Sequence, residues 1–480
     1  MPDPSTLPAL RRIAWLLALM ACSLPAAASA HDGASTHPGI ASHPIGWIVI
    51  ALFVLSYVLV ALEERIGLRK SKPVMLAATL IWGLIAWSVR GDPAQAALVS
   101  DAFERMFLDY AELFFFLIVS MTYVDAMAER GVFDVLRASF VRRALGYRAL
   151  FWITGLLAFA LSSVLNNMTT ALVVSAVVLA VGAGNARFIA ICCVNIVVAA
   201  NAGGAWSAFG DITTLMVWQA HHAGFFDFFR LFLPALVNWL VPAALMFFAL
   251  PAGKPSGTDQ EAKVKFGGIA TCALFALTIV ITVGFNQALH LPPVFGMLAG
   301  LAMLQLLGYV IARREPTYED PDLYHDRTGY SIFNIIARAE WDTLLFFYGV
   351  LLSVGGLATL GYLELASSQL YGQYGPTAAN TILGMASAIV DNIPIMYAVL
   401  QMHPAMDQNQ WLLITLTCGV GGSLLSIGSA AGVALMGTAR GQYTFTSHLR
   451  WSWAIALGYV ASVLVHLGLN NHHLVTASAP

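Results

Sequence analysis

Two short polar stretches decide the fold: SSVLNNMTT at residues 162–170 and SAIVDNIPI at residues 387–395. Each interrupts a long apolar run, 149–184 and 377–402, and leaves arms that are short for crossing a bilayer, which takes about 20 apolar residues. Polar backbone at membrane depth is tolerated only where protein or a water-filled cavity surrounds it. We therefore predict two re-entrant hairpins, with Asn166-Asn167 and Asp391-Asn392 at their tips.

The composition indicates a membrane protein. Of the 480 residues, 59% are apolar and only 10% are charged, whereas soluble domains carry about 25% charged residues. The expected fold class is an all-α polytopic membrane protein with about ten membrane spans, two re-entrant hairpins and broken helices. The expected spans are 45–62, 73–89, 106–129, 186–219, 225–250, 266–286, 292–312, 340–361, 409–437 and 451–469.

Several function classes find no support in the sequence. No basic cluster indicates nucleic acid, and the chain lacks the G-x-x-x-x-G-K-[ST] loop of nucleotide-driven pumps. The five cysteines are scattered through apolar runs and have neither metal-ligand nor disulfide spacing. We expect no cofactor, no nucleotide and no nucleic-acid partner.

The first 30 residues have the pattern of a signal peptide. Arg11 and Arg12 precede a short apolar core, and Ala28-Ser29-Ala30 forms a cleavage site before His31. An uncleaved first helix is the alternative, and residues 19–22 weakly resemble a lipoprotein box. We predict cleavage after residue 30.

The lysines and arginines are divided unevenly between the loops. If the mature N-terminus lies outside, 19 of the 24 fall in cytoplasmic segments and only Arg90, Arg105 and Arg230 fall outside. Cytoplasmic loops of membrane proteins carry this excess of basic residues. Counting either hairpin as one crossing would invert every later loop. The distribution therefore favours the hairpins, with both termini of the mature chain outside the cell inner (plasma) membrane.

Three landmarks recur in the same order along the chain. ELFFFLIVSMT (from 112) pairs with DTLLFFYGVLL (from 342), SSVLNNMTT with SAIVDNIPI, and GGAWSAFGD (from 203) with GGSLLSIGS (from 421). We predict two repeats, 40–250 and 266–470, joined by a cytoplasmic linker at 251–265 and followed by a tail at 471–480. Each repeat holds five crossings, an odd number, so the second is inverted. Inverted repeats with broken elements are typical of secondary transporters.

The first repeat offers one intramembrane carboxylate. Asp211 follows Gly210 in a span whose glycines disfavour a continuous helix, so freed carbonyls and the Thr213 and Thr214 hydroxyls could join it around a cation. The alternative is that Asp211 only caps the helix resuming at Ile212. Amide oxygens of the same repeat complete the candidate set: Asn166, Asn167 and Asn201.

The second repeat offers Asp391 and Asn392, followed by Pro394, which suits the first turn of a returning helix. A buried carboxylate can hold a sodium ion or a proton but not both fully, which is the simplest basis for antiport. Capping alone is again the alternative. Ser426 and Ser429 are candidate hydroxyl ligands in the second broken span. The predicted Na⁺ ligands are led by Asp211, Asp391 and Asn392.

Glu112 and Asp342 begin the first landmark in each repeat. They could belong to a proton path or pair with interfacial arginines. Asp125 and Glu129 stand beside Arg130 near the cytoplasmic end of their span, where we expect a solvated role.

The motifs resemble those of the NhaD-type sodium/proton antiporters of the ion-transporter superfamily. The resemblance covers residues 40–470 and is most specific in GGAWSAFGDITT and GGSLLSIGSAAGVA. It implies exchange of cytoplasmic Na⁺, or Li⁺, for external H⁺, a homodimer, and movement of a hairpin domain against a scaffold. Matched by motif, it also implies roles for Asn201, Asp211, Thr213, Thr214, Asp342, Thr343, Ser387, Asn392, Ser426, Ser429 and Glu112.

Two departures from the family pattern concern charge. Many members carry an acidic residue at the first hairpin tip, where this chain has neutral Asn166-Asn167. Ser207-Ala208-Phe209 also stands where the family often has Ser-Pro before Ile-Gly-Asp. The loss of one carboxylate would weaken cation affinity or change stoichiometry.

The predicted function is Na⁺/H⁺ antiport in sodium and pH homeostasis, with Na⁺, H⁺ and Li⁺ as ions and membrane lipid as surroundings. An anion or metalloid transporter of the same superfamily, for arsenite or a carboxylate, is the alternative. The absence of Lys and Arg from both hairpin tips argues against a dianion. An intramembrane enzyme or a channel fits the duplicated breaks less well, so we expect no enzyme activity.

Overall fold

The computed structural model describes residues 44–142, 146–182, 185–251, 253, 262–314, 330–439 and 441–470. The described residues form helices joined by turns and contain no strand, which confirms the all-α prediction. The predicted signal peptide, the tail at 471–480 and most of the linker at 251–265 lie outside the described residues.

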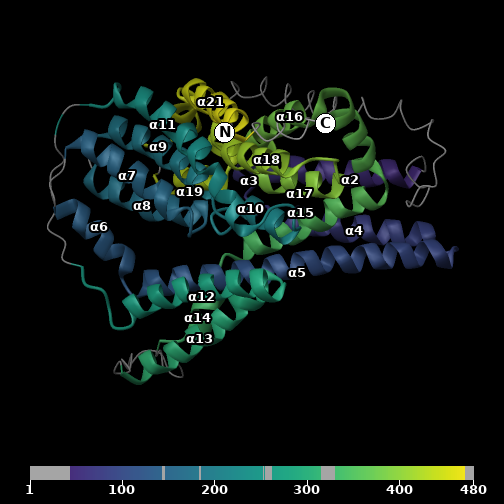
Figure 1. The fold of residues 1–480 in the computed structure, drawn as a ribbon, viewed down its shortest axis with the longest axis horizontal. Helices are drawn as coiled ribbons and strands as arrows, with labels where there is room; N and C mark the ends of the chain where they lie inside the picture. The colour runs from purple at the N-terminus through teal and green to yellow at the C-terminus, as the bar shows by residue number, and fades with distance from the viewer. Residues whose placement is uncertain are drawn as a thin grey trace, which may run out of the picture.

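One long helix, α5 (Pro93–Glu129, 37 residues), runs along most of the molecule (Figure 1). On one side of it lie α12 (Gly268–Leu289), α13 (Pro293–Arg314) and α14 (Ile332–Ala337), and the remaining helices lie on the other. The helix begins 13 residues before the predicted span, which starts at 106. Asp92 caps the helix by accepting from the Ala94 and Gln95 amides, and Pro93 occupies its first position, so it begins before the charged turn that lowers the hydropathy.

A second group of helices lies beside the N-terminal half of α5. It comprises α2 (Pro44–Ala61), α3 (Glu63–Ile66), α4 (Ser71–Val89) and α15 (Trp341–Thr359). In α4, Trp82 donates from Nε1 to the Leu352 carbonyl of α15 at 2.8 Å. At Gly349 of α15 the backbone of α4 passes so closely that a side chain would clash with Val74 and Met75. These contacts fix α15 against α4.

Each predicted hairpin stretch contains a helix, a break at the polar tip and a second helix. The first is α7 (Tyr147–Leu161) and α8 (Asn167–Val181), and the second is α16 (Tyr362–Val390) and α17 (Asn392–Met402). Helix α16 is longer than the predicted arm because it includes a kink at Gly375, where φ is 74° and Pro376 follows. Their re-entrance into a bilayer stays a prediction.

Both glycine-rich spans are interrupted, as their sequences indicate. The first divides into α9 (Ala186–Gly204) and α10 (Ile212–Gln219). The second divides into α18 (Gln408–Gly421), the short 3₁₀ turns η4 (Gly422–Leu424) and η5 (Ser426–Gly428), and α19 (Ala430–Thr438). The remaining elements are α6 (Val132–Arg142), η3 (Phe225–Leu231), α11 (Phe232–Phe247), α20 (Phe445–Leu449) and α21 (Ser452–Asn470).

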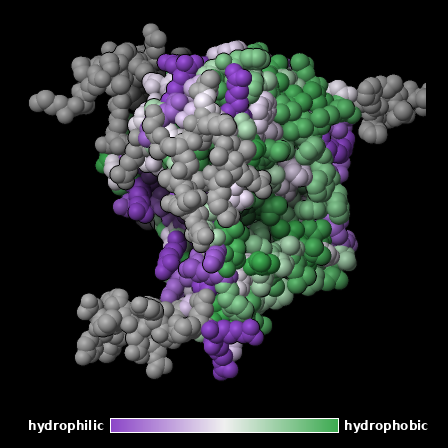
Figure 2. Space-filling model, turned by 90° about the vertical axis from the view of Figure 1, so that its left-hand side faces the viewer, coloured by the Kyte–Doolittle hydropathy of each residue, from purple (hydrophilic) through white to green (hydrophobic). Residues whose placement is uncertain are grey.

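Within the described ranges, eight helical segments are long and apolar enough to span a membrane. The two broken spans contribute only α9 to this set, and α2 is shorter, so a count of ten crossings stays a prediction. Figure 2 shows a broad hydrophobic expanse over one part of the surface, with hydrophilic residues gathered at its margins. That distribution suits a protein surrounded by lipid.

Glycines allow the hairpins to pack directly on the broken spans. A side chain at Gly203 of α9 would overlap the Phe159 carbonyl of α7, and one at Gly421 of α18 would overlap the Gly384 carbonyl of α16. In both places helix backbone meets helix backbone. Contact this close is typical of small residues at membrane helix interfaces.

We predict that Gly203→Ala destabilises the protein by about 1–3 kcal/mol, because the added methyl group overlaps backbone that has no room to move aside. Gly83→Ala in α4 is the matched control, since nothing lies within 4 Å of its position. Thermal unfolding of the purified protein in detergent, followed by size-exclusion fluorescence, measures both. Equal melting temperatures for the two variants would contradict the close packing.

Candidate functional site

Asp211 stands at the point where the first broken span resumes as a helix. It takes the N-cap position of α10 with extended backbone and is only 7% exposed. The Thr214 hydroxyl holds the turn, lying 2.8 Å from the Ser207 carbonyl and 2.6 Å from that of Asp211, and it accepts from the Asp211 amide at 3.3 Å. Thr214 therefore secures the break, and the Asp211 side chain forms a capping box with the first turn of α10 while it also reaches other partners.

The tips of both hairpins meet at this one carboxylate. Asn167 donates from Nδ2 to Asp211 Oδ2 at 3.1 Å, and Asn392 donates from Nδ2 to the same oxygen at 2.9 Å. Asp211 thus joins three segments that lie far apart in the sequence. Hydrogen bonds to a charged group each contribute about 1.5–3 kcal/mol, so the two amides stabilise the buried negative charge.

The first tip is ordered by its own side chains. Asn166 caps α8, since its Oδ1 accepts from the Thr169 amide at 2.8 Å. Ser162 donates to Asn167 Oδ1 at 2.8 Å, which fixes that amide with its NH₂ group toward Asp211. Asn166 also lines a small cavity of about 20 Å³ that Asp211 shares with α5.

The second tip holds a strained residue. Asp391 has φ 81° and ψ 150°, a conformation that is almost restricted to glycine and costs about 1–3 kcal/mol in other residues. Its Oδ1 accepts from the Asn392 amide at 2.8 Å and so caps α17. Asp391 therefore has the predicted capping contact, and the strained turn aims Asn392 at Asp211.

Buried oxygens without a hydrogen-bond partner lie on the surrounding helices. They are Asn201 Oδ1 on α9, Thr213 Oγ1 on α10 and Thr170 Oγ1 on α8, all in fully buried side chains. A buried polar atom without a partner costs free energy. Among the described residues no three His, Cys, Asp or Glu side chains gather as a metal site. Carboxylate, amide and hydroxyl oxygens without imidazole or thiol suit a hard cation.

Asn201 also links the two broken spans, because it donates from Nδ2 to the Ser423 hydroxyl at 2.9 Å. The predicted serines of the second half have local partners in this conformation. Ser387 lies 2.7 Å from the Gly384 carbonyl, Ser429 accepts from the Gly432 amide at 3.3 Å as the cap of α19, and Ser426 contacts Met436. Their hydroxyls organise the second break.

The proton-path candidates lie apart from this cluster. Glu112 of α5 lines a separate cavity of about 320 Å³. Asp342, in the first turn of α15, accepts from the Ser71 hydroxyl of α4 at 2.5 Å, and Thr343 donates to Glu340 at 3.3 Å. Glu112 and Asp342 therefore have different surroundings, although their sequence landmarks match.

Several neighbours of the site were missed from the sequence. Ser162 lies in SSVLNNMTT and Ser423 in GGSLLSIGS, so their places in the repeated motifs could have indicated them. Lys70 and Tyr57 gave none, because they come from α2 and the loop before α4. The Lys70 charge acts on Asp391, and the buried Tyr57 hydroxyl, which has no hydrogen-bond partner, is electrostatically coupled to the same carboxylate.

Comparisons with known proteins identify the family of the chain. A sequence model of a family described as citrate transporters matches residues 10–419. The chain is 52% identical over 444 residues to the Na⁺/H⁺ antiporter NhaD of Halomonas elongata, covering 88% of each chain. It is 49% identical over 477 residues to the Na⁺/H⁺ antiporter NhaD of Alkalimonas amylolytica, covering 96% of this chain and 98% of the relative. Sodium/proton antiporter 1 of Arabidopsis thaliana is 29% identical over 435 residues, covering 88% of this chain and 72% of the relative.

We predict that Asp391→Gly is more stable than Asp391→Ala by about 1–3 kcal/mol, because both variants lose the cap while only glycine relieves the backbone strain. Thermal unfolding of the two purified variants measures the difference. An alanine variant at least as stable as the glycine variant would show that the turn is unstrained.

Proposed function

Because the chain belongs to the family of NhaD-type Na⁺/H⁺ antiporters, we propose that these two ions compete for the Asp211 carboxylate between the hairpin tips. The protein is a multi-pass membrane Na⁺/H⁺ antiporter and not an enzyme. The main observation behind this proposal is the shared oxygen, Asp211 Oδ2, which accepts a hydrogen bond from one amide of each hairpin.

The two asparagines suit this exchange because an amide can present either end. With Asp211 ionised and no cation bound, the NH₂ groups of Asn167 and Asn392 take the place of a cation. Turning either amide would direct its carbonyl oxygen inward, where it can coordinate Na⁺ or accept a proton from the neutral acid. The neutral first tip therefore serves exchange at a single carboxylate.

Further oxygen ligands come from the side chains without partners. Thr213 follows Asp211 at the start of α10, and Asn201 lies on the preceding helix with a free Oδ1. We assign these two to the Na⁺-bound state, together with Asn166 at the first tip. Asp391 supports the site by aiming Asn392, and its own carboxylate is the second candidate for ion exchange.

Matching backbone contacts support the proposed inverted repeats. A side chain at Gly204 would come within 2.9 Å of the Gly210 carbonyl, and one at Gly422 within 2.6 Å of the Gly428 carbonyl. Gly210 packs against the Ser162 carbonyl of the first tip, and Gly428 against that of Ala388 in the second. The repeat offsets relate these glycines, so each broken span folds around its hairpin in the same way.

The matching family is described as citrate transporters, but the proposed site does not have the chemistry of a citrate site. A multiply charged anion needs basic groups or free helix N-termini around it. Here the N-termini of α10 and α17 carry Asp211 and Asp391, and the centre is a carboxylate held by neutral amides. Anion transport is therefore not favoured.

Finer properties extend the proposal. Cytoplasmic Na⁺, or Li⁺, leaves in exchange for external H⁺ across the cell inner membrane, and the 19-to-3 distribution of basic residues supports that orientation. The apolar surface of Figure 2 provides for lipid contact and for association of two copies. The proposed movement carries the hairpins and broken spans past α5 and its neighbours.

We predict that Asp211→Asn abolishes exchange, because an amide offers neither a negative charge to Na⁺ nor a site for the proton. In everted vesicles, Na⁺ should dissipate a preset pH gradient with the native protein and not with this variant. Asp211→Glu is the matched control and should retain measurable exchange. Full activity of Asp211→Asn would exclude this carboxylate as the site.

We predict that Asn392→Ala raises the Na⁺ concentration for half-maximal exchange by about tenfold, since the variant lacks the amide carbonyl oxygen that coordinates Na⁺ once the amide has turned. Asn167→Ala should act in the same direction. Asn409→Ala is a polar-to-alanine control at the start of α18, away from Asp211. Unchanged Na⁺ dependence in both tip variants would contradict the shared-oxygen site.

A further inference from the structure

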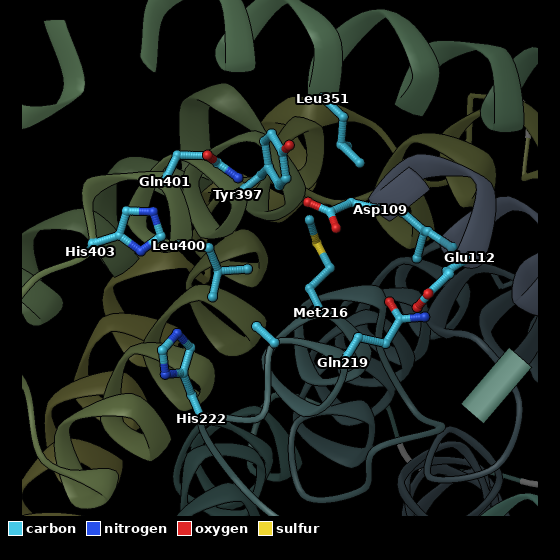
Figure 3. Close-up of a pocket in the computed structure, with 12 residues that line it drawn as sticks. Asp109, Glu112, Met216, Gln219, His222, Leu351, Tyr397, Leu400, Gln401 and His403 are labelled. Atoms are coloured by element: carbon cyan, nitrogen blue, oxygen red, sulfur yellow. The ribbon is translucent and has the colours of Figure 1, made fainter. Parts of the chain in front are cut away.

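A second polar cavity lies beside the ion site, on the side that the basic-residue distribution assigns to the outside. It measures about 320 Å³ and is walled by α5, the end of α10, α15 and α17 (Figure 3). An adjoining cavity of about 430 Å³ shares Asp109, Gln401 and His403 with it. The two together form an external vestibule, defined here by the residues that line these cavities.

Two carboxylates of α5 face this vestibule. Asp109 is exposed to it, and Glu112 stands one turn deeper and half-buried. Figure 3 shows the side chains of Asp109, Glu112, Tyr397 and Gln219 around the same cavity. Residues three apart share one helical face, so the two carboxylates form a continuous acidic edge.

Two polar groups opposite that edge are buried without partners. The Tyr397 hydroxyl lies in a side chain that is 3% exposed, and the Gln219 Nε2 atom is also shielded from solvent. Both residues line the vestibule, and both can donate a hydrogen bond. An acidic edge facing unused donors is suited to a bound water, which accepts from the donors and donates to the carboxylates.

The vestibule and the small cavity beside Asp211 are lined by successive turns of α5. Leu113 of α5 lines it, whereas Phe116, Leu117 and Ser120 line the small cavity beside Asp211. Phe116 contacts Phe209 with ring centroids 5.4 Å apart, and both rings line the small cavity. Leu113 and Phe116 are three residues apart, which is about 5 Å along a helix, so a small displacement of this aromatic pair would connect the two cavities.

Two helices lead from the ion site into the vestibule. Helix α10 begins at Asp211 and α17 at Asp391, and both end at its wall, near His222 and His403. Both helices belong to the segments that form the proposed site, while α5 and α15 belong to the opposite wall. The vestibule therefore lies between the two groups of helices that the exchange cycle would displace.

We propose that Asp109 and Glu112, with Tyr397 and Gln219 as donors, form an external proton-loading site that feeds Asp211. This inference rests on the proposed function. A proton from external water binds the Asp109 carboxylate, passes to that of Glu112, and then reaches Asp211 as Na⁺ leaves, so each carboxylate returns to its ionised form. Clefts lined by one sign of charge raise the capture rate of counter-ions about 10–1,000-fold.

Other titratable groups line the same vestibule, and their effects can be distinguished from those of the carboxylates by varying the pH. His222 stacks on Trp411 at 3.8 Å, and its partial burial, with His403 and His221 nearby, lowers its pKa. Imidazole is neutral above about pH 8, so the carboxylates are left to collect protons there. Arg105 lies one turn outward, and its charge acts on Asp109. The absence of a three-ligand cluster among the described residues favours a proton over a metal ion.

The test uses right-side-out membrane vesicles loaded with Na⁺, with the external pH varied from about 6 to 9 and Na⁺ efflux measured. We expect Asp109→Asn and Glu112→Gln to slow efflux about tenfold near pH 9 and less than about twofold near pH 6, where protons are abundant. Tyr397→Phe should shift the profile in the same direction by a smaller factor. The half-saturating internal Na⁺ concentration should stay unchanged.

Asp101→Asn is the matched control, because it makes the same change on an exposed residue of α5 outside the vestibule. Its pH profile should coincide with that of the native protein. Coincident profiles for Asp109→Asn and the native protein, or an equal loss at every pH, would overturn the proposal. A changed inhibition by external Na⁺ with an unchanged pH profile would also overturn it, because the vestibule would then hold Na⁺. Failure of the native protein to exchange would instead reject the proposed function.

Discussion

One carboxylate oxygen, Asp211 Oδ2, unites the parts of this protein that function requires. It receives an amide from Asn167 and another from Asn392, so both hairpins and the first broken span share a single hydrogen-bonding centre. A buried charge costs several kcal/mol unless such partners surround it. The same partners must be displaced or turned when an ion binds. In the proposed cycle, these hydrogen bonds therefore also couple ion binding to the position of the hairpins.

That centre depends on backbone that is not helical. Asp211 can reach the tips because α9 ends at Gly204 and α10 begins at Ile212, and the intervening turn is held by Thr214. Gly203 and Gly421 allow the hairpin carbonyls to lie directly against the broken spans. Replacing these glycines would move the tips away from Asp211 before any ligand was changed, so residues without a functional side chain also determine the site.

Much of this arrangement could be predicted from the sequence. Polar interruptions in apolar runs predicted helix breaks at Asn166-Asn167 and at Asp391-Asn392. Asp211 was recognisable as the intramembrane carboxylate of the first repeat, because burying a charged side chain in a membrane costs free energy. The hydrogen-bond partners of Asp211 could not be predicted, because whether Asn167, Asn392 or Ser429 faces it depends on how four helices cross. Lys70 and Tyr57 gave no local signal, since they approach Asp391 from helices far away in sequence. The start of α5 was missed because Asp101, Glu104 and Arg105 mask a helix that tertiary packing and the Asp92 cap sustain.

The carboxylates of Asp211 and Asp391 have different surroundings. The Asp211 carboxylate accepts from two neutral amides, and in the proposed cycle it is the group that takes up a cation or a proton. The Asp391 carboxylate caps α17 through Oδ1, and Lys70 is the cationic side chain whose charge acts on it. A second mobile cation would have to compete with that fixed one. The proposed exchange therefore centres on Asp211, and the strained turn at Asp391 aims Asn392 at that carboxylate.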